Sequence, residues 1–346
     1  MTSTDEQRPT PDPSALDLAM RLRQMISAYQ VSQAVHVAAV LGIPDLLKDG
    51  ARPCDELARS SGSDEDGLYR LLRALAGVGV FAEVSPRRFA LTPLSALLRS
   101  DVDGSLHALA VMNGQEWFWR PWGRLVDGVR TGGSVFEPIF GMPYFEYLQR
   151  NPAARGVFQK ALAGASSRAA VADLYDFSTS RRVADIGGGT GALLAAILGR
   201  HPAVHGILLE RAAVLDGAKR FLADAGVLDR CDLVDGDFFE SVTAGADTYI
   251  LSQVLHDWSD EAAHRILSNC RAVMPPDGKI LVVERVLPEG GAQKGPLTDL
   301  NMLVLMGGRE RTRGEYEVLL ARAGFRITGV MAMGEAWSLI EGVPVE

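Results

Sequence analysis

Apolar residues in the first hundred positions recur with the spacing of α-helices. After Ser14 an apolar residue returns every three or four positions, and a second apolar stretch from Val31 to Leu41 ends at Gly42. Pro44 stands just beyond, as is common past the end of a helix. We expect helices over both stretches. The first repeat consists of Leu18, Leu22, Met25, Ile26 and Tyr29.

Two more helices and a hairpin complete the pattern of this region. Helical spacing predicts helices over Cys54–Arg59 and Leu68–Ala76. Two short runs, Val80–Val84 and Arg88–Leu91, predict the strands of a hairpin. Helix, helix and hairpin in this order form the winged-helix arrangement. The sequence therefore predicts a mainly helical, winged-helix-like domain over residues 14–105.

The segment that follows is crowded with aromatic side chains. Three of the five tryptophans fall within six residues, and a helix that opens at Asn151-Pro152 carries Phe158. Flat, rigid rings line pockets for aromatic ligands, whereas packing between two domains explains the same residues without a ligand. We expect residues 106–175 to be a helical linker that contributes Trp117 and Phe158 to a substrate pocket. The aromatic residues before the helix are Trp117, Phe118, Trp119, Trp122, Phe136, Phe140, Tyr144, Phe145 and Tyr147.

From residue 182 onward, strands and helices alternate. Apolar runs predict five strands, two crossover helices between them, and a closing pair of strands. This alternation predicts an α/β fold with a Rossmann-like doubly wound sheet over residues 176–346. The strands are Arg182–Asp185, Gly206–Glu210, Cys231–Val234, Asp247–Leu251 and Lys279–Glu284, the helices are Ala212–Ala225 and Glu261–Met274, and the closing strands are Phe325–Met331 and Ala336–Glu341.

Composition narrows the class of protein. The chain has 346 residues, 47 % of them hydrophobic and 23 % charged, which suits a globular protein of two domains. The net charge of −8 argues against a surface for nucleic acid or anionic membrane, and no apolar run reaches the roughly 18 residues that span a bilayer. We expect the polar, proline-containing residues 1–13 to be a disordered tail and not a secretion signal. The three cysteines form no C-x-x-C pair, which favours a reduced, cytoplasmic protein without disulfides or a zinc cluster.

A glycine-rich loop follows the first predicted strand of the sheet. Gly187, Gly189 and Gly191 have the spacing G-x-G-x-G, whereas the dinucleotide fingerprint is G-x-G-x-x-G, so a nicotinamide enzyme is disfavoured. Glycine permits positive φ and lets a ligand approach the main chain closely. Asp185, two residues before the first glycine, suits a ligand with an ammonium group near the loop. The sequence predicts a cofactor site at Asp185, Gly187 and Gly189.

Polar residues stand at the ends of the other predicted strands as well. Glu210 closes the second strand about twenty residues past the glycines, where a carboxylate can accept both ribose hydroxyls. The third strand leads to Asp237, which suits an adenine amino group, and to Phe238, whose ring suits the adenine face. The fourth leads to His256, and the fifth ends at Glu284. Because ligands of open α/β sheets bind at the carboxyl ends of strands, we expect these side chains to surround one site.

Four motifs resemble those of a known family. The glycine loop resembles that of class I S-adenosylmethionine-dependent methyltransferases. Together the motifs resemble the plant- and bacterial-type small-molecule O-methyltransferases, the group of caffeate O-methyltransferase and of tailoring enzymes in antibiotic pathways. Where plant members carry a lysine near the adenosine this chain has Ser252, and where they carry the ribose aspartate it has Glu210. The motifs are Asp185-Ile186-Gly187-Gly188-Gly189-Thr190-Gly191, Gly236-Asp237-Phe238-Phe239, Leu255-His256-Asp257-Trp258-Ser259-Asp260 and Gly307-Gly308-Arg309-Glu310-Arg311-Thr312.

The resemblance implies a cofactor, an assembly and roles for single residues. S-adenosylmethionine would be the cofactor, with Ser252 included in its site, and the helical first half would form the dimerisation domain of a homodimer. In the family a histidine takes the substrate proton and two glutamates hold its ring, and these positions fall on His256, Glu284 and Glu310. Trp258 would cover part of the adenosine.

The chemistry of histidine supports this role independently. A phenol, with a pKa of about 10, is a poor nucleophile at neutral pH, whereas a histidine with a pKa of about 6.5 can take its proton. A carboxylate on the second ring nitrogen fixes the tautomer and stabilises the imidazolium. A structural interpretation is also open, in which His256 caps the helix that begins near Ser259. For Asp257, contact with a substrate hydroxyl and helix capping together with Asp260 are both open.

These observations predict an S-adenosylmethionine-dependent O-methyltransferase that methylates a hydroxyl, phenolic in type, of a small aromatic natural product. We expect Asn301, Met302 and Met306 to line the substrate pocket with Trp117 and Phe158, and we expect no metal site. Alternatives on the same cofactor site are hydroxylation, decarboxylation, and N- or C-methylation. A transcriptional regulator is disfavoured because acidic residues flank the second winged-helix helix and would repel DNA. Neither nucleic acid nor membrane is an expected partner.

Overall fold

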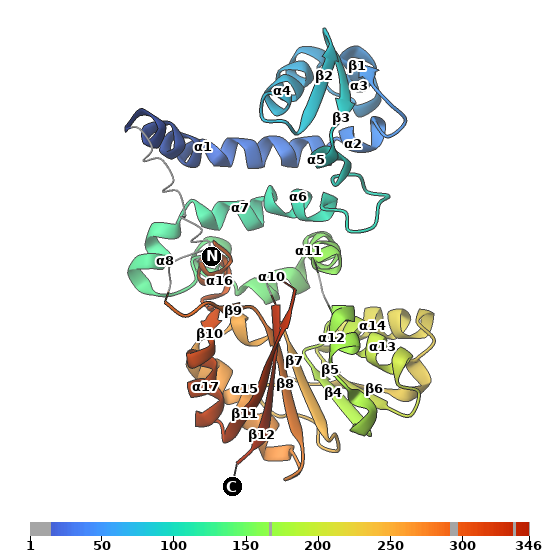
Figure 1. Ribbon diagram of the computed structural model, residues 1–346, viewed down its shortest axis with the longest axis vertical. Coiled ribbons are helices and arrows are strands. Elements are labelled where there is room, and N and C mark those ends of the chain that lie inside the picture. The colour runs from blue at the N-terminus through green and yellow to red at the C-terminus, as the bar shows by residue number, and fades with distance from the viewer. Residues whose placement is uncertain (1–14, 166–167, 291–296, 335–336, 346) are drawn as a thin grey trace, which may run out of the picture. The chain divides into compact units, whose positions relative to one another are not determined.

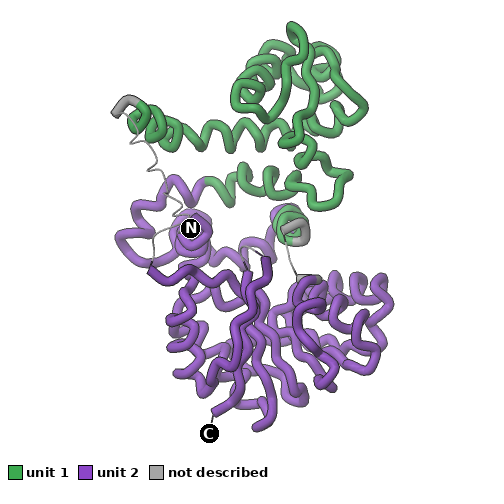
Figure 2. Tube along the Cα trace, viewed as in Figure 1, with its two compact units in different colours: residues 1–119, 156–165 green, residues 120–155, 166–346 purple. Residues whose placement is uncertain are grey.

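The computed structural model of the chain describes residues 15–165, 168–290, 297–334 and 337–345 (Figure 1). Contacts within the chain divide it into two compact units, which Figure 2 shows in different colours. The first unit comprises residues 1–119 and 156–165, and the second comprises residues 120–155 and 166–346. The predicted tail at residues 1–13 lies outside the described part of the chain, and the predicted boundaries at residues 105 and 175 stay predictions.

The first unit contains the predicted winged-helix arrangement. Its elements are α1 (Ala15–Val40), α2 (Ile43–Leu46), β1 (Arg52–Pro53), α3 (Cys54–Ser61), α4 (Glu65–Gly77), β2 (Phe81–Ser85), β3 (Arg88–Leu91), α5 (Pro93–Ala96), α6 (His107–Asn113) and the start of α7 (Glu116–Trp122). Asp64 caps α4 by accepting a hydrogen bond from the Gly67 amide at 2.8 Å. The short strand β1, which the sequence did not predict, extends the hairpin to a sheet of order β1-β3-β2. Leu57, Leu72 and Phe89 are fully buried in the core between helices and hairpin.

Helix α1 is continuous over 26 residues and joins the two predicted stretches into one element. Within its own unit it packs against α4 and α6. Its remaining surface is strongly apolar, with Met25 67 % and Ile26 69 % exposed. A contiguous row of exposed large apolar side chains marks an interaction surface. The exposed apolar residues of α1 are Leu18, Met20, Leu22, Met25, Ile26, Tyr29, Val31, Val37 and Val40.

The second unit begins with short helices that carry many of the aromatic residues. They are α8 (Leu125–Thr131), α9 (Phe136–Phe140) and α10 (Tyr144–Arg150). Next in the chain come α11 (Pro152–Ala165), whose residues 156–165 belong to the first unit, and α12 (Arg168–Leu174). The Phe136 ring centroid lies 4.5 Å from that of Phe140, 5.1 Å from Tyr144 and 5.4 Å from Tyr147. Packing on one another therefore accounts for these four rings without a ligand.

The sheet of the second unit has the predicted doubly wound topology. The strand order is β11-β12-β8-β7-β4-β5-β6, with the five strands from β8 to the edge strand β6 parallel and β12 antiparallel to β8 (Figure 1). The chain runs outward from β4 to β6 and then returns to β7 on the other side of β4, so the order reverses beside the glycine loop. This is where open α/β sheets bind ligands. The strands are β4 (Arg182–Ile186), β5 (His205–Glu210), β6 (Cys231–Asp235), β7 (Thr248–Ser252), β8 (Lys279–Glu284), β11 (Phe325–Met333) and β12 (Trp337–Pro344).

Helices cover both faces of this sheet. One core packs α15 and α17 against the sheet, and the other packs α12, α13 and α14. A two-stranded parallel pair, β9 and β10, was not predicted from the sequence. Among the described residues, none of the helices combines the length and apolar character that crossing a membrane requires. The remaining elements are α13 (Ala192–Arg200), α14 (Ala212–Asp224), α15 (Asp260–Val273), β9 (Val286–Leu287), α16 (Leu297–Met306), β10 (Arg311–Thr312) and α17 (Arg313–Arg322).

Candidate active site

The glycine loop has a backbone that only glycine adopts without strain. Gly187, Gly189 and Gly191 have φ angles of 72°, 60° and 76°, in the left-handed region. Gly188 lies directly on the carboxylate of Asp185, because a Cβ added to it would be 2.3 Å from Asp185 Oδ2. Asp185 is fully buried beneath the loop. Its contact with a cofactor ammonium therefore stays a prediction, while its place under the loop is established.

Glu210 ends β5, Asp237 follows the end of β6 by two residues, and both contact Arg211. Glu210 accepts hydrogen bonds from the amides of Gly189 at 3.0 Å and of Arg211 at 2.8 Å. Burial raises the pKa of Glu210. Asp237 accepts from the Phe239 amide at 2.8 Å, and its other oxygen lies 2.5 Å from Arg211 Nη1. Sequence reasoning missed Arg211, although its position directly after the predicted ribose acid was a signal.

The remaining predicted cofactor residues lie around the same loop. The Phe238 ring would be 3.2 Å from a Cβ added to Gly187, so it lies against the loop. Trp258 packs edge-on against Phe239, with ring centroids 4.7 Å apart. The hydroxyl of Ser252, at the end of β7, is buried and makes no hydrogen bond within the described part of the chain. These features fit a nucleoside cofactor with a polar amino-acid end, such as S-adenosylmethionine. They are the hydroxyl of Ser252, the glycine loop and the carboxylate of Glu210.

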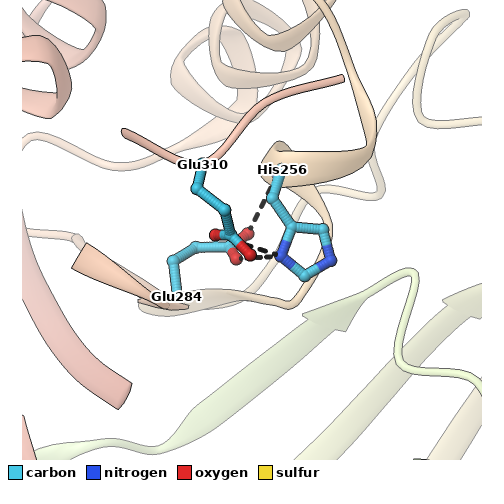
Figure 3. A group of neighbouring side chains, drawn as sticks. All are labelled: His256, Glu284 and Glu310. Atoms are coloured by element: carbon cyan, nitrogen blue, oxygen red, sulfur yellow. Dashed lines mark hydrogen bonds and ion pairs between the residues drawn. The ribbon is translucent and has the colours of Figure 1, made fainter. Parts of the chain in front are cut away.

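His256 sits on a single 3-10 turn, Leu255–Asp257, which follows β7 and is called the histidine turn below. Gln253, just before it, has a φ of 57°, a conformation that costs a non-glycine residue free energy and persists where surrounding contacts hold it. The ring of His256 points toward Glu284 and Glu310 (Figure 3). Its Nδ1 lies 2.8 Å from Glu284 Oε2 and 3.9 Å from Glu310 Oε2. The structure therefore brings the three predicted catalytic residues together.

Glu284, at the end of β8, binds the backbone of the turn as well as the ring. Its Oε1 accepts hydrogen bonds from the amides of Val254 at 3.0 Å, Leu255 at 2.8 Å and His256 at 3.3 Å. Its Oε2 is the atom that contacts the His256 ring. A fully buried carboxylate with these partners has little freedom to reorient.

Glu310 comes from the loop between α16 and β10. Its amide donates to Asp299 at 2.8 Å, and its Oε1 lies 3.8 Å from Arg285 Nε. Burial raises the pKa of Glu310 to about 7. One ligand atom each from His256, Glu284 and Glu310 lies within 4.8 Å of the others, a spacing that a metal ion could use. That the site needs no metal stays a prediction.

Asp257 contacts the other nitrogen of the histidine and caps no helix. Its Oδ1 lies 3.3 Å from His256 Nε2. Ser259 is the N-cap of α15, because its hydroxyl accepts from the Ala262 amide at 3.3 Å. The interpretations in which His256 caps this helix, or Asp257 does so with Asp260, are therefore wrong.

The carboxylates set the charge of the histidine. Burial alone lowers the pKa of His256, but the negative charges of Glu284 and Asp257 outweigh burial and hold this pKa well above 6.5. Burial likewise raises the pKa of Asp257. The two carboxylates therefore favour the imidazolium form of the ring.

The predicted substrate residues divide between the two units. Trp117 is buried and packs edge-on against Phe118, and Phe158 is half-buried on α11, both in the first unit. Asn301, Met302 and Met306 lie on α16 in the second unit. Asn301 Oδ1 accepts a hydrogen bond from the Trp122 indole at 3.2 Å, within that unit. A pocket formed jointly by the two sets stays a prediction.

Comparisons with known proteins find relatives along the whole chain. Residues 122–326 match the family model of the O-methyltransferase domain, and residues 23–101 match that of the O-methyltransferase dimerisation domain. The chain is 46 % identical to the phenazine O-methyltransferase of Lysobacter antibioticus over 96 % of this chain and 98 % of the relative. The solved structure of a mitomycin 7-O-methyltransferase has a TM-score of 0.91 at 36 % identity and covers 96 % of this chain and 100 % of that one.

Other similar proteins differ in their reactions. The structure of a neocarzinostatin-pathway O-methyltransferase, with S-adenosylmethionine and 2-hydroxy-5-methyl naphthoic acid, has a TM-score of 0.82 at 32 % identity and covers 91 % of this chain and 96 % of that one. An 8-amino-8-demethylriboflavin N,N-dimethyltransferase of Streptomyces davaonensis is 37 % identical over 93 % of this chain and 94 % of the relative. An aclacinomycin 10-hydroxylase of Streptomyces purpurascens is 36 % identical over 96 % of this chain and 91 % of the relative.

The charge arrangement around His256 can be tested directly. Asp257→Asn removes the carboxylate that faces Nε2, so the pKa of His256 should fall relative to the wild type. Titration of ¹⁵N-labelled histidine rings by NMR measures this pKa. The ring signals of the exposed His205 should be the same in both proteins. A His256 pKa that stays unchanged or rises would mean that Asp257 does not stabilise the imidazolium.

Proposed function

Since the chain belongs to the O-methyltransferase family, we propose that it transfers the methyl group of S-adenosylmethionine to a hydroxyl of a small aromatic natural product. The observation that carries this proposal is the geometry of His256. The Glu284 carboxylate lies 2.8 Å from Nδ1 of the ring, which favours a proton on Nδ1, and Nε2 is directed away from the glutamates. Nε2 is then the nitrogen that accepts the substrate proton.

The reaction follows from these positions. S-adenosylmethionine supplies a methyl group on a sulfonium, which keeps the electrons of the broken carbon–sulfur bond and becomes a neutral thioether. A lone pair of the substrate oxygen forms the new carbon–oxygen bond, and the hydroxyl proton passes to His256 Nε2. Glu284 and Glu310 stabilise the imidazolium that results. Neutral His256 is the active form, so turnover should rise as pH increases through its pKa, which lies above 6.5.

Asp257 supports a narrower class of substrate. Its Oδ1 and His256 Nε2 are acceptors 3.3 Å apart. Two donors on neighbouring ring atoms, such as a catechol or an ortho-aminophenol, have a similar separation and can engage both acceptors. We therefore expect a good substrate to carry a second donor beside the hydroxyl that is methylated.

N-methylation is the second candidate. The riboflavin-derivative N,N-dimethyltransferase has similar identity and coverage to several O-methylating relatives. An aromatic amine is nucleophilic without prior loss of a proton, so its methylation depends less on a catalytic base. The buried set of His256, Glu284 and Glu310 favours a hydroxyl acceptor over an amine. Hydroxylation, as in the aclacinomycin relative, does not call for a methyl-transfer base.

We also propose that the protein is a homodimer through its first unit. Residues 23–101 match a dimerisation domain, and α1 exposes a row of large apolar side chains inside and next to that match. A second copy of the chain would bury this row, which the unit itself leaves exposed. The cytoplasmic location expected from cysteine usage stays a prediction.

Isotope transfer tests the reaction. A panel of phenols, naphthols, catechols and ortho-aminophenols is incubated in air with the protein and methyl-labelled S-adenosylmethionine. Mass spectrometry should find the label on an oxygen of one compound, with S-adenosylhomocysteine formed in equal amount. A labelled nitrogen would favour the second candidate. Gain of oxygen or loss of a carboxyl group without label would contradict methyl transfer altogether.

Removal of the base tests the role of His256. With an accepted substrate, His256→Ala should lower turnover by about 10²–10⁴-fold, the usual worth of a positioned base. Cofactor affinity, measured by calorimetry, should stay near that of the wild type, because the cofactor residues are untouched. The exposed His205 gives the matched control His205→Ala, which should keep its turnover. Wild-type turnover in His256→Ala would refute the assignment of the base.

A charge on α1 tests the dimer. Ile26 is 69 % exposed on this helix, so Ile26→Asp should leave each subunit folded and raise the dissociation constant of the dimer at least about tenfold. Light scattering over a concentration series measures the constant. Val318→Asp, at a residue 62 % exposed on α17, is the control and should not change it. Equal dissociation constants for Ile26→Asp and the wild type would place the interface elsewhere.

A further inference from the structure

The carbonyl groups of the histidine turn have an unusual partner. While the amides of Leu255 and His256 donate to Glu284, the carbonyl of Leu255 in the turn and that of Trp258 just after it face the guanidinium of Arg311. Arg311 Nη1 donates to the Leu255 carbonyl at 2.8 Å, and Nη2 donates to the Trp258 carbonyl at 2.9 Å. These two carbonyls lie immediately on either side of His256 and Asp257, so one planar group spans both residues.

Arg311 itself is held firmly in place. Its side chain is 1 % exposed, and Asp260 balances its charge at 2.9 Å. A lone salt bridge to half-exposed Asp260 would not require the arginine to be buried. Even when its hydrogen bonds are met, a buried ion pair is often no more stabilising than apolar side chains of similar volume. Stability alone is therefore a weak reason for an arginine at this position.

The segment that carries Arg311 lies directly on the histidine turn. A Cβ added to Gly308 would be 2.1 Å from the His256 carbonyl oxygen, so only glycine fits this contact. The Arg309 amide donates to the same oxygen at 2.9 Å. The segment thus holds the turn from the side opposite Glu284, and it also delivers Glu310 to the ring.

We propose that Arg311 is a positioning residue for His256. Its guanidinium fixes the carbonyl side of the histidine turn and thereby the direction of Nε2 and the contact between Nδ1 and Glu284. The consequence for turnover rests on the proposed function, in which Nε2 accepts the substrate proton. The consequence for the ring itself does not, because the geometry of His256 can be measured without any substrate.

Arg311→Lys is the informative variant. Lysine keeps the positive charge beside Asp260, but a single ammonium cannot span the carbonyls of Leu255 and Trp258 as a planar guanidinium does. We expect turnover to fall at least about tenfold, as misplacement of a catalytic group does. Turnover is compared at saturating cofactor, and the dissociation constant of S-adenosylmethionine is measured in parallel, because Arg311 also holds the carbonyl of Trp258, which is predicted to cover the adenosine. Arg313→Lys, an exposed arginine two residues away that pairs only with Glu317 among the interactions described, is the matched control.

Histidine-ring NMR supplies the readout that needs no turnover. As the charge is retained, loosening of the turn should lower the pKa of His256 in Arg311→Lys by weakening its contacts with Glu284 and Asp257. The lower pKa with reduced turnover supports the proposal. If the pKa of His256 falls in Arg311→Lys but the wild-type protein methylates no compound, the positioning role of Arg311 is supported and the proposed function is refuted. Wild-type turnover and pKa in Arg311→Lys would overturn the proposal, as would loss of folding, which would make Arg311 a general structural residue.

Discussion

A single carboxylate, that of Glu284, fixes both the backbone and the ring of the proposed base. Its Oε1 accepts three consecutive amides, which holds the histidine turn at the end of β7. Its Oε2 sets the ring by contact with Nδ1. Because β7 and β8 are paired neighbours in the parallel sheet, the position of this carboxylate relative to the turn follows from strand register. Gln253 has a strained left-handed backbone conformation, and the contacts of Glu284 with the turn help to maintain it.

On the cofactor side of the site, too, a carboxylate at the end of a strand holds the backbone of a loop. Glu210 accepts the Gly189 amide, so the ribose acid of the sequence prediction also holds the glycine loop. Arg211 connects it to Asp237, two residues past the end of the next strand. Polar side chains at the strand ends thus bind each other and the loops. Because these side chains are already in place, less free energy is spent on orienting them when a ligand binds or reacts.

The sequence predicted the central sheet and the grouping of His256, Glu284 and Glu310, because buried strands and the residues at their ends leave local patterns. It missed β1, β9 and β10, since two-residue strands are too short to show alternation. It left Asp257 open between substrate contact and helix capping, because the residue precedes a helix and its orientation depends on tertiary packing. Arg211 was missed, and Arg311 was named only as part of a motif and given no role, for a related reason. An arginine bound to carbonyls or carboxylates far along the chain carries no local signature of its partners.

The buried cluster places stability and activity in opposition. Burial raises the pKa of Glu310 from 4.5 to about 7, so its contribution to stability is fully present below pH 4.5 and is lost as pH rises to 7. His256, whose folded pKa is raised above 6.5, contributes stability that is present below 6.5 and lost as pH rises through the folded value. The proposed methyl transfer requires the neutral ring, which forms above that value. The site therefore gains its proton acceptor in the pH range where these two groups stabilise the fold least. The contacts of Glu284 and Arg311 with the turn do not depend on a proton of the ring, and they are what can hold the neutral histidine in place.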